Sequence, residues 1–214
     1  MINYTNLTIL MATLILLLIA SIVFVNLDDI KGFFIGVFKK VRVSQKLKKF
    51  AIDHDFPLLS DVVLQVGEDK AVKIDHIMIG NKYIYVIGAK CYYGYLSAKA
   101  IDEKWLLYQG NKLKHINNPL KNNAVRIKVL AKLLNNSLDD FVNIIYLSKP
   151  VVACKIESDN NKEFVIFEED FNKFIEIYER QCQLNEFSIK SIENAAKKIF
   201  DYHQRSIINF KELN

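Results

Sequence analysis

The chain has 214 residues, of which 51% are hydrophobic and three are proline, and this composition excludes an unfolded chain. Its net charge of +5 permits contact with phosphate or anionic lipid without proving either. The cysteines Cys91, Cys154 and Cys182 are odd in number and lack C-x-x-C spacing, which disfavours a zinc or redox motif and favours reduced thiols in a cytosolic compartment.

The N-terminal segment predicts a membrane anchor. No charged side chain occurs from Met1 to Leu27, and residues 7–25 are apolar apart from two threonines and a serine. In a helix this stretch would reach about 28 Å, close to the hydrocarbon thickness of a bilayer. A cleaved signal peptide is disfavoured because the first six residues carry no Lys or Arg, the apolar run is too long and no small-x-small cleavage site follows.

Basic residues follow the anchor, and only Asp28 and Asp29 oppose them. They are Lys31, Lys39, Lys40, Arg42, Lys46, Lys48 and Lys49. The positive-inside rule therefore predicts a single-pass protein with its N-terminus outside and its C-terminal domain in the cytoplasm. Attraction to anionic lipid explains these lysines as well as nucleic acid does.

Apolar residues at helical spacing predict a second helix after the anchor, with a stripe that faces a domain core. The stripe consists of Ile30, Phe33, Phe34, Val37, Phe38 and Val41. Residues 53–57, which end in a proline, are expected to terminate this helix. Residues 61–66 then read as a strand.

The next stretch, residues 72–90, predicts a β-hairpin closed around Gly80-Asn81. Its two runs are rich in β-branched and aromatic residues. Asp75 is an ionisable group in the first run, and Lys90 ends the second. Closure of the hairpin places both near one end, where a carboxylate and an ammonium can converge on a phosphate or metal. The alternative is that both are solvated strand ends.

Beyond the hairpin, residues 92–97 and 105–109 predict short strands, and Asn118-Pro119 opens a helix that ends near residues 135–136. The tyrosines of these strands suggest a base-stacking platform or, as is commoner, core and sheet-surface positions. The last third predicts strands at 142–147, 151–156 and 164–167, and then helices at about 168–183 and 188–203. His203 and the tail are expected to be solvated.

The order of these elements resembles the nuclease-related domain (NERD) family, a branch of the PD-(D/E)xK nuclease-like superfamily. The resemblance covers roughly residues 31–135 and rests on Ile74-Asp75-His76-Ile77, Lys90, Trp105 and the Asn118-Pro119 segment through Asn123. It implies an α/β fold with a restriction-endonuclease-like mixed central sheet flanked by helices. One transmembrane helix (1–27) would precede the family domain (28–135), and C-terminal strands and helices (136–214) would complete or extend it.

The resemblance also implies a metal site that this chain does not complete. In such nucleases an aspartate, matched by Asp75, and a glutamate-x-lysine hold Mg²⁺ and position water, and the lysine is matched by Lys90. Where the family has glutamates, this chain has Gly88 and Val37. Asp75 alone would bind a metal weakly, and replacement carboxylates from Glu68, Glu103 or Glu157 have no predicted place in the site.

Three functions stay open from the sequence. The leading one is a degenerate nuclease that binds nucleic acid or phosphate, needs no cofactor and has largely lost cleavage. The others are an active Mg²⁺-dependent endonuclease and a non-enzymatic membrane interaction module. Besides Lys90, the candidate phosphate contacts are Lys73, Lys82, Lys112 and Lys114. His76, Trp105 and Pro119 are interpreted as structural: a packed histidine, a core residue and a helix start.

Overall fold

The computed structural model describes residues 11–18, 21, 27–67, 70–149, 151–153, 156, 158, 160–181 and 185–212. The chain divides into two compact units, residues 1–38 and 39–214. The described residues of the first unit, 11–18, 21 and 27–38, are helical. No helix within the described ranges is long and apolar enough to cross a bilayer. Much of the predicted anchor, residues 7–10, 19–20 and 22–26, lies outside them.

The second unit is built around a five-stranded mixed sheet in the order β1-β2-β3-β7-β9. The strands are β1 (Leu58–Gln65), β2 (Ala71–Ile79), β3 (Ile84–Lys90), β7 (Phe141–Leu147) and β9 (Glu163–Phe167). The first three are antiparallel, whereas β3, β7 and β9 run parallel. Every residue of β7 is buried, as expected for a central strand covered on both faces.

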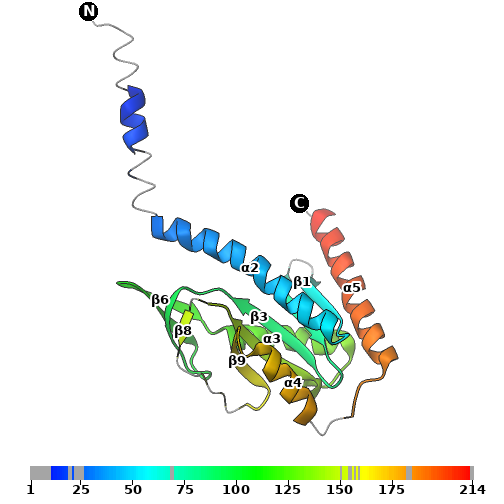
Figure 1. Ribbon diagram of the computed structural model, residues 1–214. Coiled ribbons are helices and arrows are strands. Elements are labelled where there is room, and N and C mark those ends of the chain that lie inside the picture. Colours follow the sequence, from blue (N-terminus) through cyan, green and yellow to red (C-terminus); the bar gives the residue numbers. More distant parts are fainter. Residues whose placement is uncertain are drawn as a thin grey trace, which may run out of the picture. The chain divides into compact units, whose positions relative to one another are not determined.

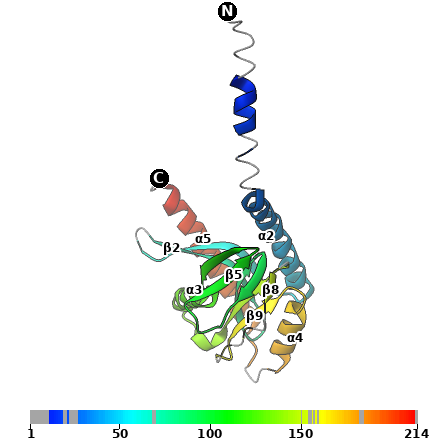
Figure 2. The ribbon, with the colours of Figure 1, turned by 90° about the vertical axis from the view of Figure 1, so that its left-hand side faces the viewer.

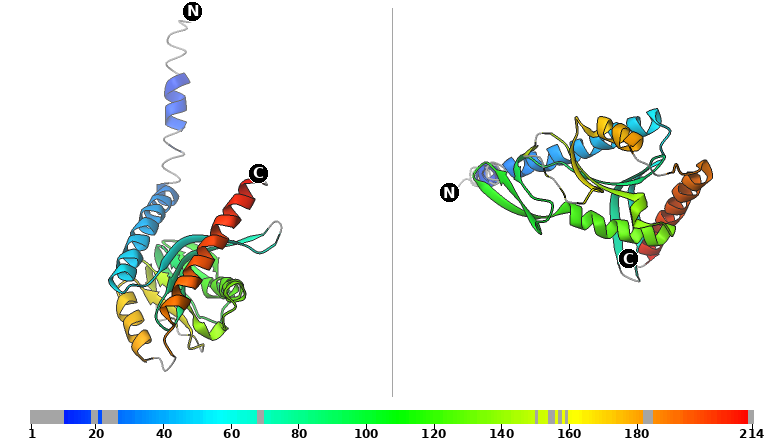
Figure 3. Two further views of the ribbon diagram at one scale, coloured as in Figure 1. Left: turned by 90° about the vertical axis from the view of Figure 1, so that its right-hand side faces the viewer. Right: turned by 90° about the horizontal axis from the view of Figure 1, so that it is seen from below.

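Helices cover both faces of this sheet (Figures 1 and 3). The second half of α2 (Leu27–Asp53) and α4 (Phe171–Gln181) pack on one face, where Leu47 and Phe171 meet Tyr85. On the other face α3 (Pro119–Leu134) and α5 (Ile189–Glu212) pack on strand residues that include Ile77 and Val86. The expected α/β architecture with a mixed central sheet flanked by helices is therefore present.

A second, four-stranded sheet was not predicted. It has the order β6-β5-β4-β8 and consists of β4 (Gly94–Ser97), β5 (Lys104–Gln109), β6 (Lys112–Asn117) and β8 (Val151–Ala153). Its inner face buries Leu96, Trp105 and Leu107 against the start of α3 and the ends of β7 and β9. The sequence predicts strands at 92–97 and 105–109 without assigning them to a sheet; in the structure β4 pairs in parallel with β8, more than fifty residues later in the chain, and not with β3.

The element boundaries correct several other expectations. The strand predicted at 151–156 ends at Ala153, α4 begins at Phe171, and α5 continues to Glu212. A 3₁₀ helix, Leu138–Asp140, precedes β7. Within the predicted apolar stripe of α2, the side chain of Val41 is 55% exposed, so it does not face the core. The side chains of residues 30–38 lie outside the described part of the chain.

Candidate functional site

The β2–β3 hairpin brings Asp75 and Lys90 together as predicted. The turn is closed by a hydrogen bond in which the amide of Gly80 donates to the carbonyl of Tyr83 at 2.8 Å. The antiparallel register pairs His76 with Ile87, so Asp75 lies one position further along, opposite Gly88. Lys90 Nζ is 3.5 Å from Asp75 Oδ2.

The Asp75 carboxylate has several partners and is largely shielded from solvent. Its Oδ2 atom accepts a hydrogen bond from the amide of Ala89 at 3.1 Å and also forms the ion pair with Lys90. The side chains are 16% exposed for Asp75 and 25% for Lys90. Nearby, burial and then the charge of Asp75 raise the pKa of Tyr92, which keeps its phenol protonated. Lys90 is therefore the cation of a small, partly enclosed site.

Gly88 occupies the position in the site at which the family resemblance implies a glutamate. A Cβ at this position would lie 3.0 Å from Cδ1 of Ile145 and 3.8 Å from Oδ1 of Asn123. Asn123 is fully buried, and its amide nitrogen donates to Val86 O at 2.7 Å and to Asn143 Oδ1 at 3.0 Å. Its Oδ1 atom has no hydrogen-bond partner among the described residues. Ile145 and Asn123 thus leave little room for a side chain at position 88.

The residues around Asp75 do not fit a resident Mg²⁺ ion. Mg²⁺ needs near-octahedral oxygen ligands. The neighbours of Asp75 are Gly88, which has no side chain, and the ammonium group of Lys90, which cannot bind a cation. Glu103 is 84% exposed and pairs with Lys121, whereas Glu68, Glu157 and the side chain of Val37 lie outside the described residues. In the described ranges, no three His, Cys, Asp or Glu side chains form a cluster able to hold a metal.

The lysines predicted as phosphate contacts lie on several elements of the fold. Lys73 lies at the same end of the hairpin but pairs with Asp61 at 2.9 Å, and Lys40 pairs with the same carboxylate at 3.0 Å. The hydrogen bond from Lys73 is the main cause that lowers the pKa of Asp61. Lys82 lies in the turn, at the opposite end of the hairpin. Lys112 and Lys114 belong to β6 of the second sheet.

His76 is structural, in agreement with its position on the strand face opposite Asp75. It is fully buried, and its Nδ1 atom lies 2.8 Å from the hydroxyl of Ser60. Its Nε2 atom has no partner among the described residues. Burial lowers its pKa, against smaller raising effects of Asp75 and Asp61. The ring is therefore a neutral core group.

Trp105 and the Asn118-Pro119 pair are structural as well. Trp105 is fully buried and donates to Lys99 O at 3.0 Å. The side-chain oxygen of Asn118 caps α3 by accepting from the amide of Leu120 at 2.9 Å. Its amide nitrogen donates to the carbonyls of Ala100 and Asp102 at 2.8 and 2.7 Å. This second role, which fastens the β4–β5 loop to the start of α3, was missed because the Asn-Pro dipeptide signals only a helix start.

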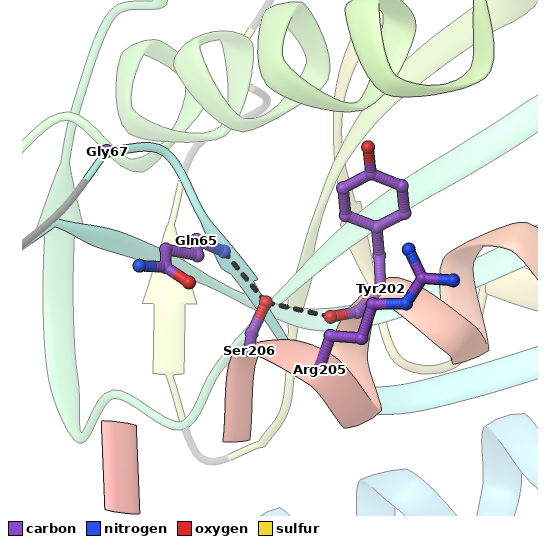
Figure 4. A pocket seen from close by; sticks show the side chains of 5 residues that line it. All are labelled: Gln65, Gly67, Tyr202, Arg205 and Ser206. Atoms are coloured by element: carbon purple, nitrogen blue, oxygen red, sulfur yellow. Dashed lines mark hydrogen bonds between the residues drawn. The ribbon is translucent and has the colours of Figure 1, made fainter. Parts of the chain in front are cut away.

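A separate cavity of about 310 Å³ lies between the end of β1 and α5 (Figure 4). It is lined by Gln65, Gly67, Tyr202, Arg205 and Ser206. The hydroxyl of Ser206 accepts from the amide of Gln65 at 3.0 Å and donates to Tyr202 O at 2.8 Å. These contacts attach α5 to the sheet, and none of the predicted site residues lines the cavity.

A mixed α/β unit that places an acid and a lysine side by side on neighbouring strands is compatible with a nuclease-like fold. The comparison with family models gives the family itself: residues 35–154 match the nuclease-related domain, NERD. Since this match covers more than half of the chain, the protein belongs to the NERD family. No curated protein and no solved structure matches the chain.

Proposed function

We propose that this protein is a membrane-anchored, cytoplasm-facing NERD-domain protein that binds nucleic acid or phosphate and has lost metal-dependent cleavage. The observation that carries the proposal is the pairing of Asp75 with Lys90 beside Gly88. A nuclease-related domain with this arrangement keeps a partly exposed ammonium able to contact a phosphate oxygen. The same arrangement provides only one of the carboxylates that metal-dependent cleavage would use.

The loss of cleavage follows from the geometry of the hairpin. The antiparallel register places position 88 opposite Asp75, where a glutamate would add a second carboxylate to the site. In this chain the position is glycine, and Ile145 and Asn123 lie close to it. Asp75 instead forms an ion pair with Lys90 and accepts a hydrogen bond from the amide of Ala89. A metal held by one carboxylate would be poorly positioned, and misplacement by about 1 Å can lower a rate roughly a hundredfold.

The anchor belongs to the proposal on sequence grounds. Residues 7–25 are long and apolar enough for one membrane span, and basic residues follow on the C-terminal flank. This orientation places the NERD domain in the cytoplasm, where its lysines can also contact anionic lipid.

A salt titration of DNA binding tests the phosphate contact. The full chain in a non-ionic detergent is titrated with fluorescent duplex DNA at several NaCl concentrations. We expect log K to fall with log salt, and Lys90→Ala to reduce the slope by about 0.9, the value for one phosphate contact. Lys132→Ala, in the last turn of α3 and not among the predicted contacts, is the matched control. Binding that does not depend on salt would contradict the proposal. A protein that co-purifies with the chain, without DNA binding, would favour the membrane interaction module.

A cleavage assay distinguishes the proposal from an active endonuclease. Plasmid DNA is incubated with the full chain and Mg²⁺ or Mn²⁺, beside an Asp75→Ala variant. We expect no nicking by either protein. Cleavage by the unchanged chain that disappears in Asp75→Ala would overturn the proposed loss of activity, whereas cleavage by both proteins would reveal a contaminating nuclease.

A further inference from the structure

The second sheet carries a continuous row of exposed side chains across its four strands. The register places Val152 opposite Tyr95, Tyr95 opposite Tyr108, and Tyr108 opposite Leu113. Opposite residues in a sheet share one face, so the four side chains form a strip from β8 to β6. Their exposed fractions are 64%, 43%, 39% and 48% in that order. Strands β5 and β8 of this sheet are labelled in Figure 2.

The two tyrosines at the centre of the strip are held side by side. Their ring centroids are 6.1 Å apart, with an angle of 47° between the ring planes. Gly94 has a φ of +107°, and a Cβ there would lie 2.0 Å from Tyr108 O, so only glycine lets the start of β4 approach β5 this closely. The side-chain amide of Gln109 also donates to Tyr93 O at 3.0 Å. The aromatic pair is thus fixed by the backbone around it.

The strip lies in a sheet that carries only positive charge. The four strands contain no Asp or Glu. By strand alternation Lys104 and His115 lie on the face of the strip, whereas Lys112 and Lys114, opposite Gln109 and Leu107, lie on the inner face. The nearest acids in sequence, Asp102 and Glu103, precede β5, and Glu103 pairs with Lys121. The inner face of the sheet is already filled by Leu96, Trp105 and Leu107, so core packing does not account for the outward tyrosines.

We propose that the outward face of this sheet is a stacking platform for single-stranded nucleic acid. Exposed aromatic rings on neighbouring strands suit successive unstacked bases, and the basic residues Lys104 and His115 on the same face suit the phosphates. Duplex DNA hides its base faces and would gain nothing from the rings. The inference rests on the proposed function, because it names the class of nucleic acid, but it assigns a site separate from Asp75 and Lys90.

An anionic membrane is the other polyanion that such a sheet would attract. A membrane interface also accommodates tyrosines, whose hydroxyls stay among the headgroups, but it makes no use of two rings held side by side. A nucleic acid strand offers hydrogen-bonding groups on its bases and sugars together with the stacking surface. These properties favour the nucleic acid, and the membrane becomes an outcome of the test.

The test measures binding of fluorescent oligothymidylate to the full chain in a non-ionic detergent by fluorescence anisotropy. We expect Tyr95→Leu with Tyr108→Leu to weaken binding at least about tenfold, because each stacked base contributes substantially to affinity. Tyr95→Phe with Tyr108→Phe, which keeps both rings, should bind like the unchanged chain. Tyr202→Leu, an equally exposed tyrosine on α5, is the matched control. Lys104→Gln, on the same face as the rings, should reduce the salt slope by about 0.7.

The outcomes separate this inference from the proposed function. Unchanged oligothymidylate binding by the double leucine variant would overturn the platform, even where Lys90→Ala still lowers duplex binding. Loss of binding in the leucine variant but not in Lys90→Ala would support the platform and contradict the phosphate contact at Lys90. If the leucine variant loses affinity only for vesicles of anionic phospholipid, the face is a membrane contact and the nucleic acid inference is wrong. Thermal unfolding of each variant shows whether the fold is retained.

Discussion

Position 88 determines how many carboxylates the hairpin site contains. Gly88→Glu places a second carboxylate opposite Asp75, and Ile145→Val removes the methyl group that lies 3.0 Å from the new Cβ. We expect the double variant to gain at least about tenfold in Mn²⁺ affinity by isothermal titration calorimetry, because two carboxylates chelate where one does not.

Two controls make the metal-binding result specific. Ile145→Val alone should leave Mn²⁺ affinity unchanged, and adding Asp75→Asn to the double variant should abolish the gain. An unchanged Mn²⁺ affinity in the double variant, with the fold intact, would count against the assignment of Asp75 and position 88 to one site.

Because His76 is buried in its neutral form, we expect the folded state to lose stability in mild acid. Its pKa is lowered in the folded state from 6.5, so the unfolded chain binds the proton more readily. The free energy of unfolding should therefore hold above pH 6.5 and fall below it, by at most about 1.4 kcal/mol per pH unit for one proton. Urea unfolding at pH 7.5, 6.5 and 5.5 measures this decline.

Other titrating groups require a variant for comparison. Burial raises the pKa of Glu179, which works in the opposite direction, since the cost of its buried charge falls as the pH drops. Asp61 loses its contribution only as the pH falls below 3.8. His76→Gln keeps a polar group near Ser60 but does not titrate. The same slope in His76→Gln and in the unchanged chain would show that another group is responsible.

At the scale of elements, α5 protects the edge of the central sheet. Strand β1 is an edge strand, and its outward amides at Val63 and Gln65 donate to His203 Nδ1 and Ser206 Oγ, both at 3.0 Å. Unpaired edge amides invite pairing with another chain, and these side chains cap two of them. The expectation that His203 is solvated was therefore wrong, because a helical sequence does not reveal which strand edge it will cover.

Ser206→Ala tests this capping. The substitution leaves the Gln65 amide without its partner next to a buried side chain, so we expect a loss of about 1–3 kcal/mol in unfolding free energy. Hydrogen exchange at the Gln65 amide should accelerate selectively. Ser191→Ala, which removes an exposed hydroxyl from the first turn of the same helix, should change stability by less than about 0.5 kcal/mol. Equal effects of the two substitutions would mean that the edge contact contributes nothing.

The elements that were predictable have a clear period or a strong signal. The β2–β3 hairpin has turn residues between two apolar runs, and α3 has an Asn-Pro start, so both were found near their observed ends. Strand β6 was missed because five of its six residues are exposed. Without a buried face, the strand does not show the alternation of apolar and polar residues that predicts a strand. Asp75 and Lys90 could be paired in advance because an antiparallel register links them, whereas Asn123 could not be placed because its contacts depend on long-range packing.

At the scale of the whole molecule, local sequence patterns could not predict which strands belong to which sheet. The sequences of short strands such as β4 and β8 do not indicate which strand each will pair with. Their parallel pairing depends on the path of the chain from β7 into the second sheet. Asn118 joins that sheet to α3, and Leu120 and Ile145 join it to the core.

The anchor proposed for residues 7–25 predicts how the whole chain partitions. Membranes from cells that express the full chain are washed with alkaline carbonate, which strips proteins held by charge but not a spanning helix. We expect the full chain in the pellet and a variant lacking residues 1–26 in the supernatant. Added protease should digest the NERD domain in inside-out vesicles and spare it in right-side-out vesicles, because the basic flank stays in the cytoplasm. Release of the full chain by carbonate would show that only the lysines hold it, and digestion in right-side-out vesicles would reverse the orientation.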